Sequence, residues 1–150
     1  MTQEDKDLLL HDLCARISYE LKGRVQAEVS TGTYDINSGH LDYTEIDIDV
    51  EVFGIQENEM IIYPVDSKYN ELIAEYPYTY EEFIPYLRPM SSMTEDEYEE
   101  YSNIANLTIY EDGRCISNGK EYDWLNVHHF DYRGLIEKRL ALEAPEGLYQ

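Results

Sequence analysis

Residues Glu45–Phe53 alternate strictly between acidic and apolar side chains up to Val52. Successive side chains of a β-strand point to opposite faces, so this pattern predicts a strand with one apolar face and one acidic face. The residues expected to pack inward are Ile46, Ile48, Val50 and Val52. The carboxylates expected on the outer face are those of Glu45, Asp47, Asp49 and Glu51.

Two further segments have the character of strands and flank this one. Val25–Val29 alternates between apolar and polar residues, and Met60–Tyr63 is an apolar run that Pro64 ends. Turn-forming residues lie between the segments, at Asn37–Gly39 and at Glu57–Glu59. Short connections favour neighbouring strands, so we expect a three-stranded antiparallel meander.

Helical spacing appears in the sequence both before and after the predicted strands, and we expect the helices to cover one face of the sheet. The expected helices cover residues 4–21, 79–84, 94–106, 121–129 and 132–142. The first has Thr2 or Gln3 near its N-cap and places Asp12 and Arg16 on its polar face. The third opens with a capping box at Thr94–Glu97.

A short hairpin completes the prediction. Leu107–Tyr110 and Cys115–Ile116 are expected to pair around Asp112-Gly113, a residue pair favoured in tight turns. The chain has no internal repeat and its length fits one domain. We therefore predict that residues 1–150 form a single α+β domain, in which helices pack on a small antiparallel sheet.

The chain is strongly acidic, with 32 Asp and Glu against 11 Lys and Arg and a net charge of -21. This charge excludes a nucleic-acid binder that works by neutralising phosphates, and it disfavours an anionic membrane surface. Residues 51–100 hold 13 of the acids and only 2 of the bases. A dense patch within them comprises Glu95, Asp96, Glu97, Glu99 and Glu100.

The compartment is inferred from three features. The N-terminal residues are acidic where a signal peptide would be basic, and no apolar stretch of about 20 residues is present. Cys14 and Cys115 are far apart in the sequence and fit no metal or disulfide spacing. We expect a cytoplasmic protein whose two thiols are buried and reduced.

No motif for catalysis, metal binding or cofactor binding is recognisable, so we expect no cofactor. His128, His129 and Asp131 are metal-ligand types, but adjacent side chains on a helix diverge by about 100° and converge poorly on one ion. An enzyme is an alternative, with a site that the fold assembles from His128, His129, Asp131 and Tyr132.

Fifteen tyrosines give a second candidate surface. Tyr76, Tyr78 and Tyr80 alternate around Pro77, and tyrosine is enriched where proteins contact one another. The competing interpretation is that these rings pack at the edge of a small core. A structural module that self-associates through this segment is a further alternative, and the oligomeric state is left open.

Three segments resemble a family of small acidic uncharacterised proteins from gut anaerobic bacteria and their phages and mobile elements. The resemblance is carried by Leu8–Arg16, Pro85–Thr94 and Asp123–Lys138, and it ends in Ala144–Gly147. Arg139 stands where members of the family carry glycine. The resemblance implies a mobile-element origin and carries no catalytic residue.

The predicted acidic strand suggests how such a protein would act. Alternate residues of a strand are about 6.6 Å apart, so its carboxylates form a regular row that can imitate a phosphate backbone. We therefore expect a non-enzymatic interaction protein with a basic protein partner, and a nucleic-acid mimic that occupies the partner's basic groove is one form of it. The competing interpretation is an acidic surface that only maintains solubility.

Overall fold

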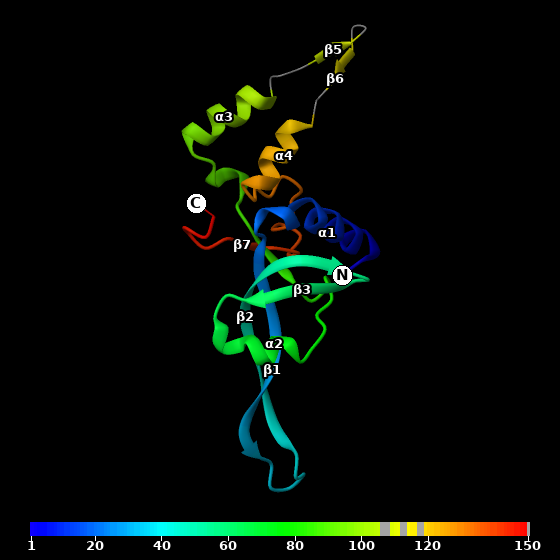
Figure 1. Ribbon diagram of the computed structural model, residues 1–150, viewed down its shortest axis with the longest axis vertical. Coiled ribbons are helices and arrows are strands. Elements are labelled where there is room, and N and C mark those ends of the chain that lie inside the picture. Colours follow the sequence, from blue (N-terminus) through cyan, green and yellow to red (C-terminus); the bar gives the residue numbers. More distant parts are fainter. Residues whose placement is uncertain (106–108, 112–113, 117–118, 150) are drawn as a thin grey trace. The chain divides into compact units, whose positions relative to one another are not determined.

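The computed structural model describes residues 1–105, 109–111, 114–116 and 119–149 (Figure 1). The helices are α1 (Gln3–Arg16), α2 (Asn70–Ala74), α3 (Glu95–Ala105) and α4 (Lys120–Val127), with 3-10 turns at Ile17–Tyr19, Ser67–Tyr69 and Met90–Ser92. The strands are β1 (Lys22–Tyr34), β2 (Leu41–Gln56), β3 (Glu59–Pro64), β4 (Ile84–Leu87), β5 (Ile109–Glu111), β6 (Arg114–Ile116) and β7 (Leu142–Glu143).

The fold is α+β, as the sequence predicts. A five-stranded sheet has the order β3-β2-β1-β4-β7, in which only the β4–β7 pair is parallel. β1, β2 and β3 form the predicted antiparallel meander. The predicted hairpin is the pair β5–β6, and its expected turn at Asp112-Gly113 lies outside the described residues. Among the described helices, none has the length and apolar character needed to span a membrane.

The chain divides into two compact units, each of which is described separately. Unit 1 comprises Met1–Tyr19 and Tyr86–Gln150, and unit 2 comprises Glu20–Pro85. The expectation that residues 1–150 form a single domain remains a prediction.

Unit 2 is built on the meander, and the predicted alternation is confirmed. Ile48, Val50 and Val52 are buried, whereas Glu45, Asp47 and Asp49 are exposed on the opposite face of β2. A two-residue turn at Glu57-Asn58 joins β2 to β3, and both residues have the positive φ that the right-handed twist of a hairpin favours. In Figure 1, α2 lies beside the meander and packs on β3.

Close contact in unit 2 requires a glycine at position 23. A Cβ atom there would overlap the ring of Phe83 and lie 2.5 Å from the carbonyl oxygen of Ile84. Phe83 is 1% exposed and fills the space that the missing side chain leaves. Gly23 therefore allows β4 to approach β1 closely.

In unit 1, α1 begins as the sequence predicts. Thr2 and Asp5 form a reciprocal capping box, in which the Asp5 amide donates to Thr2 Oγ1 and the Thr2 amide donates to the Asp5 carboxylate, both at 3.1 Å. The helix ends five residues earlier than predicted. A 3-10 turn follows Arg16, and Glu20 adopts a left-handed conformation with φ 55° that is incompatible with a continued helix.

The buried face of α1 differs from the prediction. Asp12 and Arg16 are both 0% exposed, although their charges had suggested the solvent face. Both residues can be buried because they form an ion pair, which satisfies the two charges inside the protein. Cys14 of the same helix is exposed, which contradicts the expected buried thiol, and the side chain of Cys115 lies outside the described residues.

Two predicted helices are wrong. Residues 79–84 form a turn, in which the Glu82 carboxylate accepts from the Thr79 amide at 2.8 Å, and then enter β4 because Ile84 precedes a proline. Residues 132–142 form a series of turns that ends in β7. Gly134 and Arg139 there have φ values of 73° and 60°, so neither continues a right-handed helix. Arg139 thus adopts the conformation that glycine would take most readily.

Candidate interaction site

A groove of about 510 Å³, the acidic groove, lies in unit 2. Its carboxylates belong to Glu28 of β1, Glu45 of β2, and Glu81 and Glu82 of the turn before β4. Its remaining wall includes Tyr76, Pro77 and Tyr78, together with Gln26, Ala27 and Ile84. Among these lining residues of the described part of the chain there is no lysine or arginine. The groove thus combines negative charge with aromatic surface.

Glu28 and Glu45 give the acidic groove an unusual strand pairing. They are direct cross-strand partners in the β1–β2 register, and both side chains are exposed. Like charges in opposing positions destabilise a sheet. Within the described residues, neither carboxylate has a hydrogen bond or a basic partner of its own. A cation bound between them would relieve their repulsion.

The rest of the predicted carboxylate row is partly neutralised. Arg24 of β1 contacts Asp47 at 3.0 Å and Asp49 at 3.7 Å, and Gln26 donates to Asp47 at 3.3 Å. Glu51 is half-buried and lies opposite Lys22 in the strand register. Of the four predicted positions, only Glu45 belongs to the acidic groove.

The predicted tyrosine segment is divided between two roles. Tyr76 is 56% exposed and lines the acidic groove. Tyr78 also lines it but is only 6% exposed, and burial, with the nearby charge of Glu82, raises the pKa of its hydroxyl. Tyr80 is 8% exposed and belongs to the core. Tyr78 and Tyr80 therefore pack as the competing interpretation expected.

The second predicted acidic patch lies on α3, in unit 1. Glu95, Asp96, Glu99 and Glu100 are exposed. Glu97 instead binds Arg88 through both carboxylate oxygens, at 2.7 and 2.9 Å, and also accepts from the Thr94 amide at 2.9 Å. The Arg88 hydrogen bond is the main reason that the pKa of Glu97 falls to about 2. Glu97 is therefore part of the structure of unit 1.

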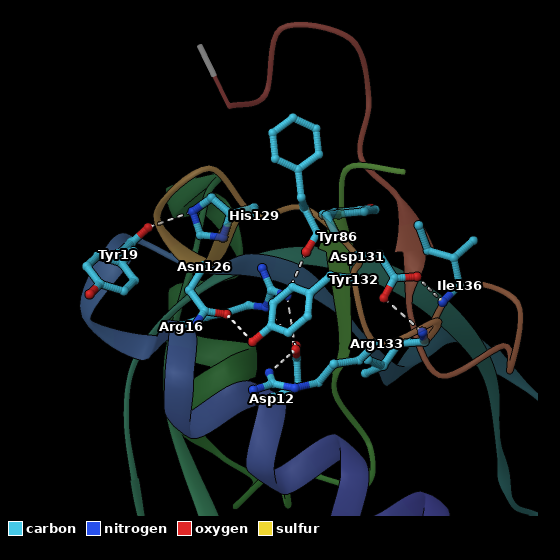
Figure 2. Close-up of polar contacts among 12 residues, drawn as sticks. Asp12, Arg16, Tyr19, Tyr86, Asn126, His129, Asp131, Tyr132, Arg133 and Ile136 are labelled. Atoms are coloured by element: carbon cyan, nitrogen blue, oxygen red, sulfur yellow. Dashed lines mark hydrogen bonds and ion pairs between the residues drawn. The ribbon is translucent and has the colours of Figure 1, made fainter. Parts of the chain in front are cut away.

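The histidines considered for an enzyme site make structural contacts. His129 is buried, and its Nε2 lies 2.7 Å from the carbonyl oxygen of Tyr19 (Figure 2). Burial is the main cause that lowers its pKa to about 4, so its ring is neutral at pH 7. His128 Nδ1 lies 2.9 Å from the carbonyl oxygen of Trp124, and the two rings are stacked.

Asp131 and Tyr132 also serve the fold. The Asp131 carboxylate accepts from the amides of Leu135 and Ile136, both at 2.8 Å, and so stabilises the turn that follows it (Figure 2). Tyr132 donates to the side-chain oxygen of Asn126 at 3.1 Å. In the described part of the chain, no three His, Cys, Asp or Glu side chains are placed to hold a metal ion.

A buried polar network joins α1 to the C-terminal segment within unit 1. Asp12 accepts two hydrogen bonds from Arg16, at 2.8 and 3.0 Å, and one from Arg133 at 2.6 Å (Figure 2). Arg16 also donates to the carbonyl oxygen of Phe130 at 2.8 Å. Both arginines lie over the ring of Tyr132. The network therefore stabilises unit 1.

Sequence reasoning missed three of the four carboxylates in the acidic groove. Glu28 had a signal, because it alternates in the predicted strand Val25–Val29, but its pairing with Glu45 depends on the hairpin register. Glu81 and Glu82 had none, because residues 79–84 were expected to be helical.

Comparisons with models of protein families, with curated proteins and with solved structures found no match to this chain. The expected resemblance to small acidic proteins of gut bacteria and their mobile elements therefore stays a prediction from the sequence.

Proposed function

We propose that the protein is a non-enzymatic interaction protein that binds a basic segment of a protein partner in the acidic groove. The observation that carries the proposal is the juxtaposition of Glu28 and Glu45 beside Tyr76 in one groove. The carboxylates offer two acceptors to a lysine or arginine side chain, and the exposed ring offers it a π face.

The charge of unit 2 supports a basic partner. Residues 20–85 carry 15 acidic and 3 basic side chains, for a net charge of -12. Two of the three bases, Lys22 and Arg24, are on β1, and Arg24 is already paired with Asp47 and Asp49. The excess charge attracts a cationic segment from a distance and speeds its association.

The groove supports local recognition more strongly than it supports mimicry of a nucleic acid. A mimic needs a regular row of unpaired charges, whereas Arg24 contacts two of the four carboxylates in the predicted row. The unpaired end of the row is at Glu45, next to Glu28. We therefore place the main contact of a partner at the groove, with the row contributing long-range attraction.

Binding of a short peptide in which lysine alternates with valine tests this proposal. The labelled peptide is titrated with the full chain and followed by fluorescence anisotropy, and a peptide with glutamine in place of each lysine is the control. We expect binding that weakens about tenfold when salt shortens the Debye length from about 10 Å to about 3 Å. Equal binding of the two peptides, or no binding of either, would overturn the proposal.

Charge-matched variants locate the contact. The double variant Glu28→Gln, Glu45→Gln removes the facing pair, and Glu99→Gln, Glu100→Gln removes the same charge from α3. We expect the first variant to weaken peptide binding about tenfold and the second less than about twofold, because close charges act more strongly than screened distant ones. Equal weakening by the two variants would mean that only overall charge matters.

A further inference from the structure

The main-chain groups of β1 alternate between its two edges. The Val52 amide donates to the carbonyl oxygen of Leu21 at 2.9 Å, which identifies these two residues as a hydrogen-bonded pair of the β1–β2 ladder. With the observed register, Val25, Ala27 and Val29 are also hydrogen-bonding positions toward β2. The amides and carbonyls of the intervening residues, among them Gln26, Glu28 and Ser30, therefore point away from β2.

β4 covers only the first part of that outer edge. It pairs with β1 at two positions, where Ile84 lies opposite Arg24 and Pro85 lies opposite Gly23. Pro85 has no amide to donate. None is needed at this position, because its partner Gly23 directs its main-chain groups toward β2. Beyond Arg24, no described strand pairs with this edge of β1. Among the described residues, no other segment donates a hydrogen bond to the main chain of Gln26, Glu28 or Ser30 at this edge or accepts one from it. Gln26 and Glu28 line the acidic groove.

We infer that the partner segment binds as an added β-strand on the open edge of β1, at Gln26, Glu28 and Ser30, and places its basic side chains in the acidic groove. This inference rests on the proposed function and specifies how the partner is held. An unpaired strand edge is a template for an extended peptide, whose main chain supplies affinity while alternate side chains supply specificity.

The acidic groove determines which strand fits this edge. Side chains of an added strand alternate between two faces, so every second residue of the segment lies on the side of Glu28 and Glu45. Those residues are basic in a matching partner, where they meet the carboxylates and the ring of Tyr76, and the residues between them lie on the opposite face. A second copy of this chain is a poor occupant, because it would bring its own Glu28 against the same carboxylates and add a second unit with a net charge of -12.

Amide hydrogen exchange of the full chain, measured by NMR with and without the lysine–valine peptide, tests the inference. In the free protein we expect fast exchange at Gln26, Glu28 and Ser30, and slower exchange at Ala27 and Val29, whose amides bond to β2. Saturating peptide should slow exchange about tenfold or more at the first three positions.

Peptides that are N-methylated at alternate positions supply the second readout. Methylation removes the amide donor. A peptide methylated at the residues whose amides face β1 should bind about tenfold more weakly, whereas methylation of the residues between them should have little effect. If the peptide binds without protecting the three amides, and the two methylated peptides bind equally, the added strand is overturned and the proposed function stays intact. Loss of all peptide binding would overturn both. Protection that appears in the absence of peptide and rises with protein concentration would identify a second copy as the occupant and overturn the basic segment.

Discussion

The substitution Asp12→Asn tests the buried polar network of unit 1. Both oxygens of Asp12 accept hydrogen bonds from arginine: Oδ2 from Arg16 Nε, and Oδ1 from Arg16 Nη2 and Arg133 Nη1. Asparagine keeps the size of the side chain but replaces one acceptor with an amide group that can only donate. The variant therefore removes the negative charge and turns a donor toward a guanidinium.

The expected loss follows from the burial of Arg16. Its side chain is 0% exposed, so its charge has no access to water once Asp12 is neutral. Removing one partner of a buried ion pair costs about 3 to 5 kcal/mol, because the other charge stays buried without compensation. Arg133, at 17% exposed, is able to turn toward solvent and adds little to this cost.

Urea unfolding, followed by the fluorescence of Trp124, measures the effect. This is the only tryptophan of the chain, and it belongs to the same unit as Asp12. Asp7→Asn is the control, since Asp7 is exposed on the same helix, and it should change the unfolding free energy by less than about 0.5 kcal/mol. The double variant Asp12→Leu, Arg16→Met removes both buried charges and should cost less than Asp12→Asn. A loss below about 1 kcal/mol for Asp12→Asn would contradict a buried Arg16 charge that depends on Asp12, because a buried unpaired charge costs more than that.

Three further predictions concern stability. Burial lowers the pKa of His129 to about 4, so the unfolded state binds a proton at higher pH than the folded state does. The contribution of neutral His129 to the free energy of unfolding is therefore complete above pH 6.5 and falls by about 3 kcal/mol as the pH drops through 4. His129→Gln should remove this part of the pH dependence of urea unfolding, and an unchanged pH profile would contradict it. Gly23→Ala should cost about 1 to 3 kcal/mol because the methyl group overlaps both the ring of Phe83 and the carbonyl oxygen of Ile84; Phe83→Leu in the same chain should recover the part due to the ring, and additive losses would show that the ring contributes nothing. Glu97→Gln should lower the melting temperature by weakening the bidentate bond to Arg88, at about 1 to 2 kcal/mol, and an unaltered melting temperature would show that the pair contributes nothing.

The sequence predicted those parts of the fold that depend on local pattern. The alternation in Glu45–Phe53 determines a strand and its two faces without knowledge of its neighbours. The capping box at Thr94–Glu97 likewise identified the start of α3. β4 and β7 were not predicted, because they are only four and two residues long and their pairing is a property of the tertiary fold.

The buried face of α1 shows why charged residues mislead such a prediction. Asp12 and Arg16 are four residues apart and fit an exposed ion pair on a helix surface. Their burial depends on Arg133, which is 121 positions away from Asp12 in the sequence. No local pattern contains that contact, so only the tertiary structure identifies the pair as buried.

The candidate site was predicted in part for the same reason. Glu45 and Tyr76 were identified from strand alternation and from aromatic spacing, and the structure brings both to one groove. Glu28 joins them because the β1–β2 register places it opposite Glu45. The acids of α3 lie in the other unit and are not part of the groove. Residue types were therefore predictable, whereas their grouping was not.

A chemical-shift titration of the full chain with the lysine–valine peptide tests most directly whether a basic segment binds in the acidic groove. We predict that the shifts of main-chain amides will concentrate at residues 26–30, at Glu45, at Tyr76 and at residues 78–82, and will saturate together at one affinity. Shifts that concentrate instead on Glu95–Glu100 of α3, or that spread evenly over all acidic residues, would contradict a binding site in the acidic groove.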